Sequence, residues 1–365
     1  MKQIRRLLDE YQITTCGPGP SPHPAVEHIE LDPNFVPTRG RVMSLVDEVA
    51  RNYERFGWLY RNLPMPVLIR QKLAGRTFDV AIANDANTVG IASEIVGADR
   101  VLADLHEFFP GLPQPDSELG RRQARWWTWL VRAHCAKAGA ATTVGSLIAE
   151  RYVEYGVTAG VVANASPRKD LEVHPTSQPI RLVHSGNPFR DRGLGTIMQA
   201  VARTKTDVTL DLYLMQQNQL ELAEVVALAD ELGPRITVHD PVSQSELVET
   251  LNTYDIGIHV LPPTSINNAL ALPNKFFDFV QARLGVIVGP SPEMASNVQQ
   301  YDLGWVTESF DEDAIVAVLD SLTPEVVDEH KRASDAASGK LSAEKQNEIW
   351  VSALSGILAK KGLAG

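Results

Sequence analysis

The length, composition and charge of the chain exclude several classes of protein. Its 365 residues are too many for one ordinary domain and fit two domains of about 150–200 residues. A formal charge of −11 argues against a broad nucleic-acid-binding surface, and a content of two cysteines, Cys16 and Cys135, argues against a disulfide framework or a zinc cluster. The amino-terminal stretch lacks the apolar core of a signal peptide, and no run of about 18 apolar residues predicts a membrane span. We therefore expect a cytoplasmic α/β enzyme.

In the first half of the chain, short apolar runs rich in β-branched residues alternate with helical patterns. Strands are predicted at residues 12–16, 78–83, 100–104, 140–144 and 160–163. Helices are predicted at residues 41–56, 64–74, 87–97, 118–138 and 145–155. The next segment, 164–179, carries Pro167, Pro175 and Pro179 and has no clear period, which indicates a linker.

The same alternation occurs again in the second half. Strands are predicted at residues 180–185, 208–214, 235–238, 256–260, 285–288 and 304–306. Helices are predicted at residues 193–204, 218–231, 243–252, 274–283, 292–299, 311–320 and 324–336. Continuous apolar strands separated by helices predict parallel sheets covered on both faces. We therefore expect two Rossmann-like domains, residues 1–165 and 166–340, followed by a helix in 341–365 that can pack back on the first domain.

A glycine-containing loop at residues 185–193 follows a predicted strand and opens a predicted helix. Gly186 and Gly193 permit a tight turn and the close approach of a ligand to the backbone. The helix amino terminus beyond them favours an anion such as a diphosphate, to which Arg190 and Arg192 can add full positive charge. The alternative is an ordinary strand–helix loop with solvated arginines.

A second candidate is the stretch Leu272–Asp278, at the start of a predicted helix. Pro273 suits the first helical turn, and Lys275 and Asp278 lie three residues apart on one helix face. A lysine in the first turn opposes the helix dipole, and becomes favourable if an anion binds there. Asp278 can then accept hydrogen bonds from ribose hydroxyls. The alternative is a solvent-facing Lys–Asp pair.

His106 follows a predicted strand of the first domain, where ligands of open α/β sheets bind. It can contact an acceptor hydroxyl or a developing charge, or it can be a loop histidine with structural hydrogen bonds.

The acidic triplet Asp311–Asp313 lies at a predicted helix start, which favours helix capping over metal binding. Since the histidines show no metal-ligand spacing either, no metal site is predicted.

Taken in chain order, these segments resemble the group-1, retaining glycosyltransferases of the GT-B fold, in which two Rossmann-like domains have parallel sheets facing a central cleft. Residues 78–165, with DVAIANDANTVGIA and VLADLHEFFPG, are similar to part of the family's acceptor domain. RLVHSGNPFRDRGLGTIMQAV resembles the family's donor-phosphate loop, and the stretch from LNTYDIGIHV to GPSPEMASNV resembles its donor-binding segment. The family often has two glutamates eight positions apart in that segment; here the second falls on Asp278 and the first on Leu270.

The resemblance implies a role for each candidate residue. Arg192 takes the place of the family's phosphate-binding lysine, His106 falls near its acceptor-side histidine, and polar residues near Leu270 replace the lost glutamate. The implied donor-phosphate residues are Gly186, Arg190, Arg192 and Lys275, the ribose residue is Asp278, the sugar-side candidates are Asn267, Asn268 and Asn274, and the catalytic candidate is His106.

Compared with the family, the chain begins late. Members open with a strand and a glycine-containing loop before the helix that MKQIRRLLDEY resembles. The resemblance therefore implies that the first strand of the amino-terminal domain is missing, with a gap beside the strand at residues 78–83.

The implied activity is transfer of a sugar from a nucleotide diphosphate sugar to an acceptor hydroxyl with retention, in cell-envelope, polysaccharide or glycolipid synthesis. Cationic side chains would stabilise the leaving diphosphate without a metal or other cofactor. The implied partners are the donor and a saccharide or lipid-linked acceptor, with no nucleic acid. Two alternatives remain open: a catalytically impaired relative that binds nucleotide sugars or serves as a partner subunit, and a nucleotide-sugar epimerase of the same fold.

One further segment bears on the acceptor and on localisation. Residues 121–137 combine three tryptophans with six basic residues, counting His134. A helix of this composition can contact a membrane surface, which would place a cytoplasmic protein at the inner face of the membrane. The alternative is a core-packing helix with solvated arginines.

Overall fold

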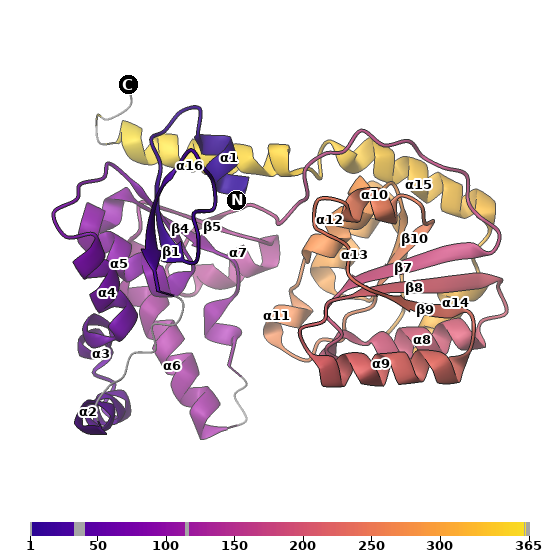
Figure 1. The fold of residues 1–365 in the computed structure, drawn as a ribbon, viewed down its shortest axis with the longest axis horizontal. Coiled ribbons are helices and arrows are strands. Elements are labelled where there is room, and N and C mark those ends of the chain that lie inside the picture. The colour runs from indigo at the N-terminus through magenta and orange to yellow at the C-terminus, as the bar shows by residue number, and fades with distance from the viewer. Residues whose placement is uncertain (1, 33–40, 114–116, 361, 363–365) are drawn as a thin grey trace. The chain divides into compact units, whose positions relative to one another are not determined.

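The computed structural model of the chain describes residues 2–32, 41–113, 117–360 and 362. The chain forms two compact α/β units (Figure 1). Unit 1 consists of Met1–Val162 together with Asn347–Gly365, and unit 2 consists of Ala163–Gln346. None of the helices in the described ranges combines the length and apolar content needed to cross a membrane.

The strands of unit 1 form two separate parallel sheets. The larger has the order β3-β4-β5-β6, and the smaller pairs β1 with β2. Among the described residues, β3 has one strand neighbour, β4, so its other edge is open. These strands are β1 (Thr14–Pro18), β2 (Glu27–Leu31), β3 (Ala81–Asn84), β4 (Val101–Leu105), β5 (Ala140–Thr143) and β6 (Ala159–Val161).

The long carboxyl-terminal helix α16 (Ala343–Ala359) covers one face of the larger sheet of unit 1. Its Trp350, Leu354 and Ile357 form a buried cluster with Leu102 of β4 and Val162. This burial removes apolar surface from water and therefore fixes the helix on unit 1. The other helices of unit 1 are α1 (Lys2–Leu7), α2 (Arg41–Asn52), α3 (Phe56–Asn62), α4 (Pro64–Lys72), α5 (Ala86–Val96), α6 (Glu118–Ala133) and α7 (Ser146–Val153).

Unit 2 contains a six-stranded parallel sheet with the order β12-β11-β10-β7-β8-β9. The chain builds β7, β8 and β9 in one direction, then returns to the other side of β7 for β10, β11 and β12. The strand order therefore reverses between β7 and β10. The strands are β7 (Ile180–Gly186), β8 (Val208–Leu214), β9 (Ile236–His239), β10 (Ile256–His259), β11 (Gly285–Val288) and β12 (Gly304–Val306).

Helices cover both faces of the sheet in unit 2, and each face has its own apolar core. One core contains residues of α8, α9 and α14, and the other contains residues of α10, α12, α13 and α15. The helices are α8 (Leu194–Arg203), α9 (Gln219–Leu232), α10 (Leu247–Leu251), α11 (Ile266–Ala269), α12 (Asn274–Gln281), α13 (Pro292–Tyr301), α14 (Glu312–Asp320) and α15 (Pro324–Ser338).

The predicted α/β class is confirmed, and two of the predicted helices need correction. The helix predicted at 41–56 ends at Asn52, and a separate helix α3 begins at Phe56; Glu54 between them adopts a left-handed φ of 52°. The helix predicted at 118–138 ends at Ala133 and is followed by the 3₁₀ turn Cys135–Lys137. Strand β2 was not predicted.

Candidate functional site

The topology of unit 2 marks one place as a ligand site. In open parallel sheets, ligands bind beyond the carboxyl ends of the strands where the strand order reverses. In unit 2 this place is the end of β7 and β10. Each of these apolar strands carries one buried histidine near its end, His184 on β7 at 0% exposure and His259 on β10 at 1%.

Lys275, the second residue of α12, extends to this place. Its Nζ lies 3.0 Å from Nε2 of His184. The other ring nitrogen of His184, Nδ1, lies 2.8 Å from the carbonyl oxygen of Ile258. Because a carbonyl oxygen only accepts, Nδ1 must carry the hydrogen, and Nε2 is left to accept a hydrogen bond from Lys275. His184 therefore fixes the position of the Lys275 amine by accepting its hydrogen bond.

The electrostatics of this cluster favour binding of an anion. Burial and the neighbouring Arg192 lower the pKa of Lys275 to about 7. Burial and the charge of Lys275 also hold the pKa of His184 well below its ordinary value, so its imidazole is neutral. Two cationic groups in one partly desolvated place repel each other, and a bound anion would relieve that repulsion.

His259 adds an unusual feature to this cluster. Its ring centroid lies 5.4 Å from that of His184, and neither of its nitrogens has a hydrogen-bond partner in the described part of the chain. Burial and the charge of Lys275 lower its pKa well below the ordinary value. A buried polar group without a partner is costly, so the ring is a candidate to meet a polar atom of a ligand.

Two positions of the loop need glycine, and one of them, Gly186, lies beside Lys275. Gly186 ends β7 with a φ of 134°, and a Cβ atom there would lie 2.9 Å from Nζ of Lys275. Gly193 is the N-cap of α8 with a φ of 72°, and a Cβ atom there would lie 2.8 Å from the carbonyl oxygen of Val260. Both positions therefore require glycine, and the loop between them passes close to the lysine.

The structure places the two arginines of this loop differently. Arg192 contributes to the lowered pKa of Lys275, His184 and His259, so it lies within electrostatic reach of all three. Arg190 is 68% exposed and forms an ion pair with Glu224 on α9. Arg192 is thus a member of the cluster, whereas Arg190 is engaged elsewhere.

The remaining candidates of unit 2 lie on α11 and α12. Asn268 donates to Asp191 at 3.3 Å, and Asp191 in turn lies 3.6 Å from Arg192, which connects α11 to the loop. Asp278 lies one turn beyond Lys275, is 3% exposed and accepts a hydrogen bond from Ser166. The neighbouring candidates Asn267 and Asn274 occupy the second position of α11 and the first of α12.

The acidic triplet at residues 311–313 has a structural role. Asp311 is the N-cap of α14 and accepts a hydrogen bond from the backbone nitrogen of Ala314 at 3.0 Å. Asp313 forms an ion pair with Arg203 at 2.8 Å. Helix capping, as predicted, accounts for Asp311, whereas Glu312 and Asp313 form ion pairs with Arg203.

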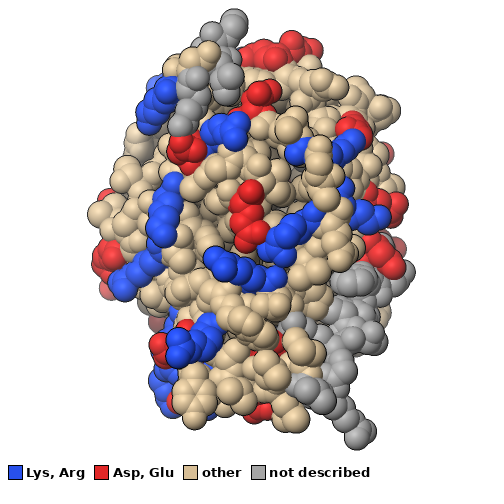
Figure 2. All heavy atoms as spheres, turned by 90° about the vertical axis from the view of Figure 1, so that its left-hand side faces the viewer, with Lys and Arg blue, Asp and Glu red and all other residues tan. Residues whose placement is uncertain are grey.

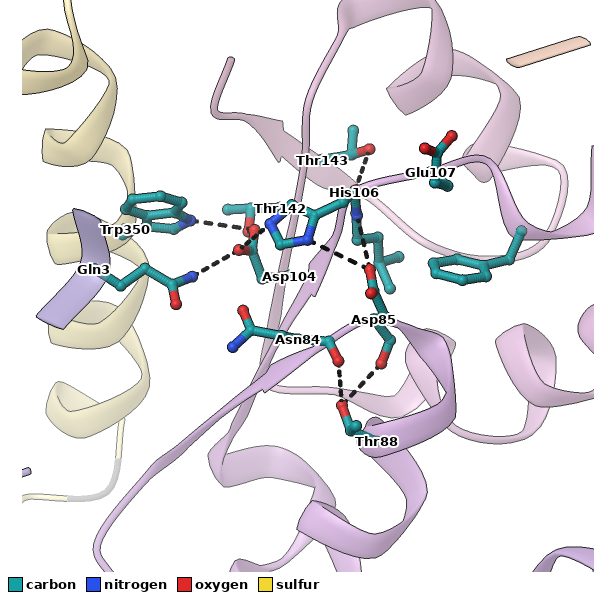
Figure 3. Close-up of polar contacts among 12 residues, drawn as sticks. Gln3, Asn84, Asp85, Thr88, Asp104, His106, Glu107, Thr142, Thr143 and Trp350 are labelled. Atoms are coloured by element: carbon teal, nitrogen blue, oxygen red, sulfur yellow. Dashed lines mark hydrogen bonds and ion pairs between the residues drawn. The ribbon is translucent and has the colours of Figure 1, made fainter. Parts of the chain in front are cut away.

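In unit 1, His106 lies between two carboxylates at the ends of β3 and β4 (Figure 3). Its Nε2 is 3.1 Å from Asp104 and its Nδ1 is 3.4 Å from Asp85. Hydrogen bonds to Asp104 and Asp85 raise the pKa of His106 to about 10. The ring is therefore an imidazolium at neutral pH, which can offer positive charge or a proton but cannot act as a base.

Asp104 is the buried anchor of this arrangement, at 1% exposure. It accepts hydrogen bonds from Thr142 at 2.5 Å, from Gln3 at 2.6 Å and from the indole nitrogen of Trp350 at 3.2 Å (Figure 3). Side chains from β5, α1 and α16 thus converge on one carboxylate of β4. Since its lone pairs are engaged, Asp104 positions His106 rather than a ligand.

Asp85 has a different character from Asp104. Its side chain is 42% exposed, and its backbone adopts a φ of 69° and a ψ of 154°, a conformation that is normally restricted to glycine. Such strain costs about 1–3 kcal/mol and is concentrated at functional sites. A ligand can reach this carboxylate, which makes Asp85 a candidate site residue.

Sequence reasoning missed Asp85, His184 and His259. A usable signal existed for the two histidines, since each is an ionisable residue within an apolar strand, in IRLVHSG and in IGIH. Asp85 gave no comparable signal, because its importance lies in a backbone conformation that the residue type does not suggest.

Comparison with solved structures reveals clear similarity. Sucrose-phosphate synthase from Thermosynechococcus elongatus matches with a TM-score of 0.70 at 13% identity, covering 98% of this chain and 92% of that one. A UDP-forming α,α-trehalose-phosphate synthase from Burkholderia vietnamiensis matches with a TM-score of 0.66 at 10% identity, covering 96% of each chain. HepE from Anabaena, solved with UDP and glucose, matches with a TM-score of 0.62 at 14% identity, covering 94% of this chain and 99% of that one.

These matches show that the chain has the GT-B fold of such glycosyltransferases over most of its length. At these identities the similarity extends to the fold alone. No protein-family model matches the sequence, and a search of curated proteins finds no significant relative.

Proposed function

We propose that the chain is a glycosyltransferase that takes its sugar from a nucleotide diphosphate sugar bound to unit 2. The observation that carries the proposal is the convergence of Lys275, His184 and Arg192 beside Gly186, at the reversal of strand order. Partly buried positive charge beside a glycine loop suits a diphosphate. The similarity to the UDP-forming synthase and to HepE with UDP and glucose supports this class of ligand.

In this proposal Lys275 and Arg192 stabilise the negative charge that develops on the leaving diphosphate, a task that elsewhere can fall to a metal ion. Asp278 binds the ribose after exchanging its hydrogen bond with Ser166. Asn267, Asn268 and Asn274 bind the sugar, and His259 supplies a further polar contact. Arg190 assists only if its ion pair with Glu224 opens.

The acceptor, a saccharide or a lipid-linked saccharide, would bind to unit 1 at Asp85 and His106. The exposed carboxylate of Asp85 offers a hydrogen-bond acceptor to sugar hydroxyls, and the neighbouring imidazolium of His106 offers a positive charge. His106 acts in this proposal as a fixed cation, and Asp85 is the group that accepts a hydroxyl hydrogen bond. Transfer with retention of configuration rests on the family resemblance.

The donor site is tested by thermal shift and calorimetry of the full chain with UDP, GDP, ADP and their sugars. We expect one nucleotide series to bind, and we expect Lys275→Ala and Arg192→Ala each to weaken binding by about 10–100-fold, since each removes a charge-assisted contact. Lys205→Ala is the matched control, because Lys205 is an exposed lysine of unit 2 outside the cluster. Equal affinities for the control and the two cluster variants would contradict the assignment.

Turnover is tested separately from binding. Release of the nucleoside diphosphate from the bound donor, with and without added sugar acceptors, identifies a transferase. Binding without release of the diphosphate would instead identify an impaired relative, and conversion of one nucleotide sugar into another would identify an epimerase. Asp85→Asn should reduce transfer without changing donor affinity, because Asp85 belongs to unit 1.

A further inference from the structure

Helix α2 (Arg41–Asn52) exposes the side of the helix that soluble proteins normally bury. Leu45, Val49 and the following Tyr53 are spaced four residues apart and are 63%, 55% and 75% exposed. On the same helix Asp47 and Ala50 are each 6% exposed. Residues four apart share one helix face, so α2 presents an apolar stripe outwards while burying a carboxylate.

The neighbouring helices extend this apolar surface. Helix α3 packs against both α2 and α4, and Trp58 of α3 and Met65 of α4 are each 42% exposed. Half of the exposed large apolar side chains in the described residues, seven of fourteen, fall between residues 43 and 65. Such a concentration marks an interaction surface rather than scattered exposure.

The segment that carries this surface is basic in an acidic protein. Residues 41–76 contain seven basic and three acidic side chains, whereas the whole chain has 34 and 45. Lys and Arg side chains are spread over this side of unit 1 in Figure 2. Exposed cations without an ion pair to any described residue include Arg51, Arg55, Arg61 and Lys72.

We propose that this face of α2–α4 docks on a membrane surface that carries anionic lipid headgroups. The apolar stripe of α2 would enter the boundary between headgroups and acyl chains, and Tyr53 and Trp58 suit that boundary because their rings are amphipathic. The arginines would lie at the level of the phosphates. The protein would thus be a peripheral membrane protein, held by one face of unit 1.

A second copy of the chain is a poorer occupant of this face. A symmetric contact would place the same patch on itself, so that Arg51, Arg55 and Arg61 would oppose one another. An anionic lipid surface has the complementary charge. The charge of the patch therefore favours lipid over self-association.

This surface differs from the basic, tryptophan-rich segment at residues 121–137. Trp126 packs edge-on against Phe56 with ring centroids 5.6 Å apart, and Trp127 lies 4.9 Å from Phe109. Arg122 and Arg125 form ion pairs at 3.0 Å with Glu118 and Glu54. These tryptophans hold α6 within unit 1, whereas the concentration of exposed apolar side chains lies on α2–α4.

Co-sedimentation of the full chain with vesicles tests the proposal. We expect binding to vesicles of phosphatidylcholine with 30% phosphatidylglycerol, weak binding to phosphatidylcholine alone, and weakening as salt is raised. Two variants address the two components of the surface: Leu45→Glu with Val49→Glu for the apolar stripe, and Arg51→Gln with Arg61→Gln for the charge. Each should lower the partition coefficient by about tenfold or more.

Matched controls lie on unit 2. Leu220→Glu changes a leucine that is 68% exposed, and Lys205→Gln with Arg332→Gln removes two exposed cations. These controls should sediment like the unaltered protein, and all variants should keep its circular dichroism and melting temperature. Equal loss of binding in controls and test variants would overturn the proposal. Failure of the protein to bind vesicles would also overturn it. The surface would then be a self-association site if the protein forms a dimer that Leu45→Glu dissociates, or a protein-binding site if an acidic protein binds it.

Discussion

At the scale of single residues, His106 is a cation that its neighbours keep charged. Because Asp104 and Asp85 raise its pKa to about 10, the ring should remain protonated from pH 6 to 8.5. Titration of the ring by NMR, with His106→Asn to assign its signal, should show no midpoint in this range. Asp104→Asn should bring the midpoint below about 8.5, because it removes the largest of the contributions that raise the pKa. A wild-type midpoint near 6.5 would show that the two carboxylates do not hold the proton.

Lys275 should make donor binding depend on pH. Its pKa of about 7 in the free protein means that a growing fraction is neutral as the pH rises above 7. A bound diphosphate favours the charged amine and raises that pKa, so binding above pH 7 must take up a proton. The affinity for the nucleotide sugar should therefore be constant below about pH 6 and fall between pH 7 and 9.

Calorimetry in two buffers of different ionisation enthalpy measures this proton uptake directly. The nucleotide sugar is the right ligand, because its diphosphate does not titrate in this range. The control is Lys275→Arg, whose guanidinium stays charged throughout, so that its binding should be weaker but independent of pH. The same pH dependence in both proteins would assign the proton to another group.

At the scale of elements, helix α16 supports the site of unit 1 through one hydrogen bond and its apolar side chains. Trp350→Phe keeps the packing and removes the indole donor from the buried Asp104. We expect a loss of about 1–3 kcal/mol in the free energy of unfolding of unit 1, measured by urea denaturation. Trp58→Phe, which alters a 42% exposed ring on α3, should change that free energy by less than about 0.5 kcal/mol.

Strands whose apolar residues form a distinct run or alternation were the ones that could be predicted from the sequence. The predicted strands at 208–214, 285–288 and 304–306 match β8, β11 and β12 residue for residue. The site loop also lies where it was predicted, between β7 and α8. In β11 every residue is buried, and in β8 buried residues alternate with partly exposed ones, so each apolar pattern coincides with its strand.

Other features depend on contacts that local patterns do not encode. Strand β2 reads EHIEL and has one fully buried residue, Leu31, so it lacks the apolar run that identifies the other strands. The hydrogen bond from Lys275 to His184 joins residues 91 positions apart, and that from Trp350 to Asp104 spans 246. Spacing along the chain cannot reveal such pairs, because the tertiary fold alone brings them together.

At the scale of the whole molecule, the division into two units predicts two unfolding transitions in calorimetry. In unit 2, the buried ion pair between Lys331 and Asp255 at 2.9 Å gives a way to perturb one unit alone. Lys331→Ala leaves a buried carboxylate uncompensated and should destabilise unit 2 by about 3–5 kcal/mol. The transition of unit 2 should fall while that of unit 1 stays constant, and a bound nucleotide should raise only the unit 2 transition.

The control for that experiment is Arg332→Ala, the exposed neighbour on α15, which should move neither transition. A single transition that shifts as a whole in Lys331→Ala would show that the two units unfold together.

The return of the carboxyl-terminal helix to unit 1 also has a consequence for synthesis on the ribosome. Unit 2 is one continuous stretch, Ala163–Gln346, and it interrupts unit 1. Nascent unit 1 must therefore wait for all of unit 2 to be translated, roughly 10–40 seconds at typical elongation rates, before α16 can cover Leu102 and Val162. During that interval its apolar face is open to chaperones and to aggregation, whereas unit 2 can finish folding first.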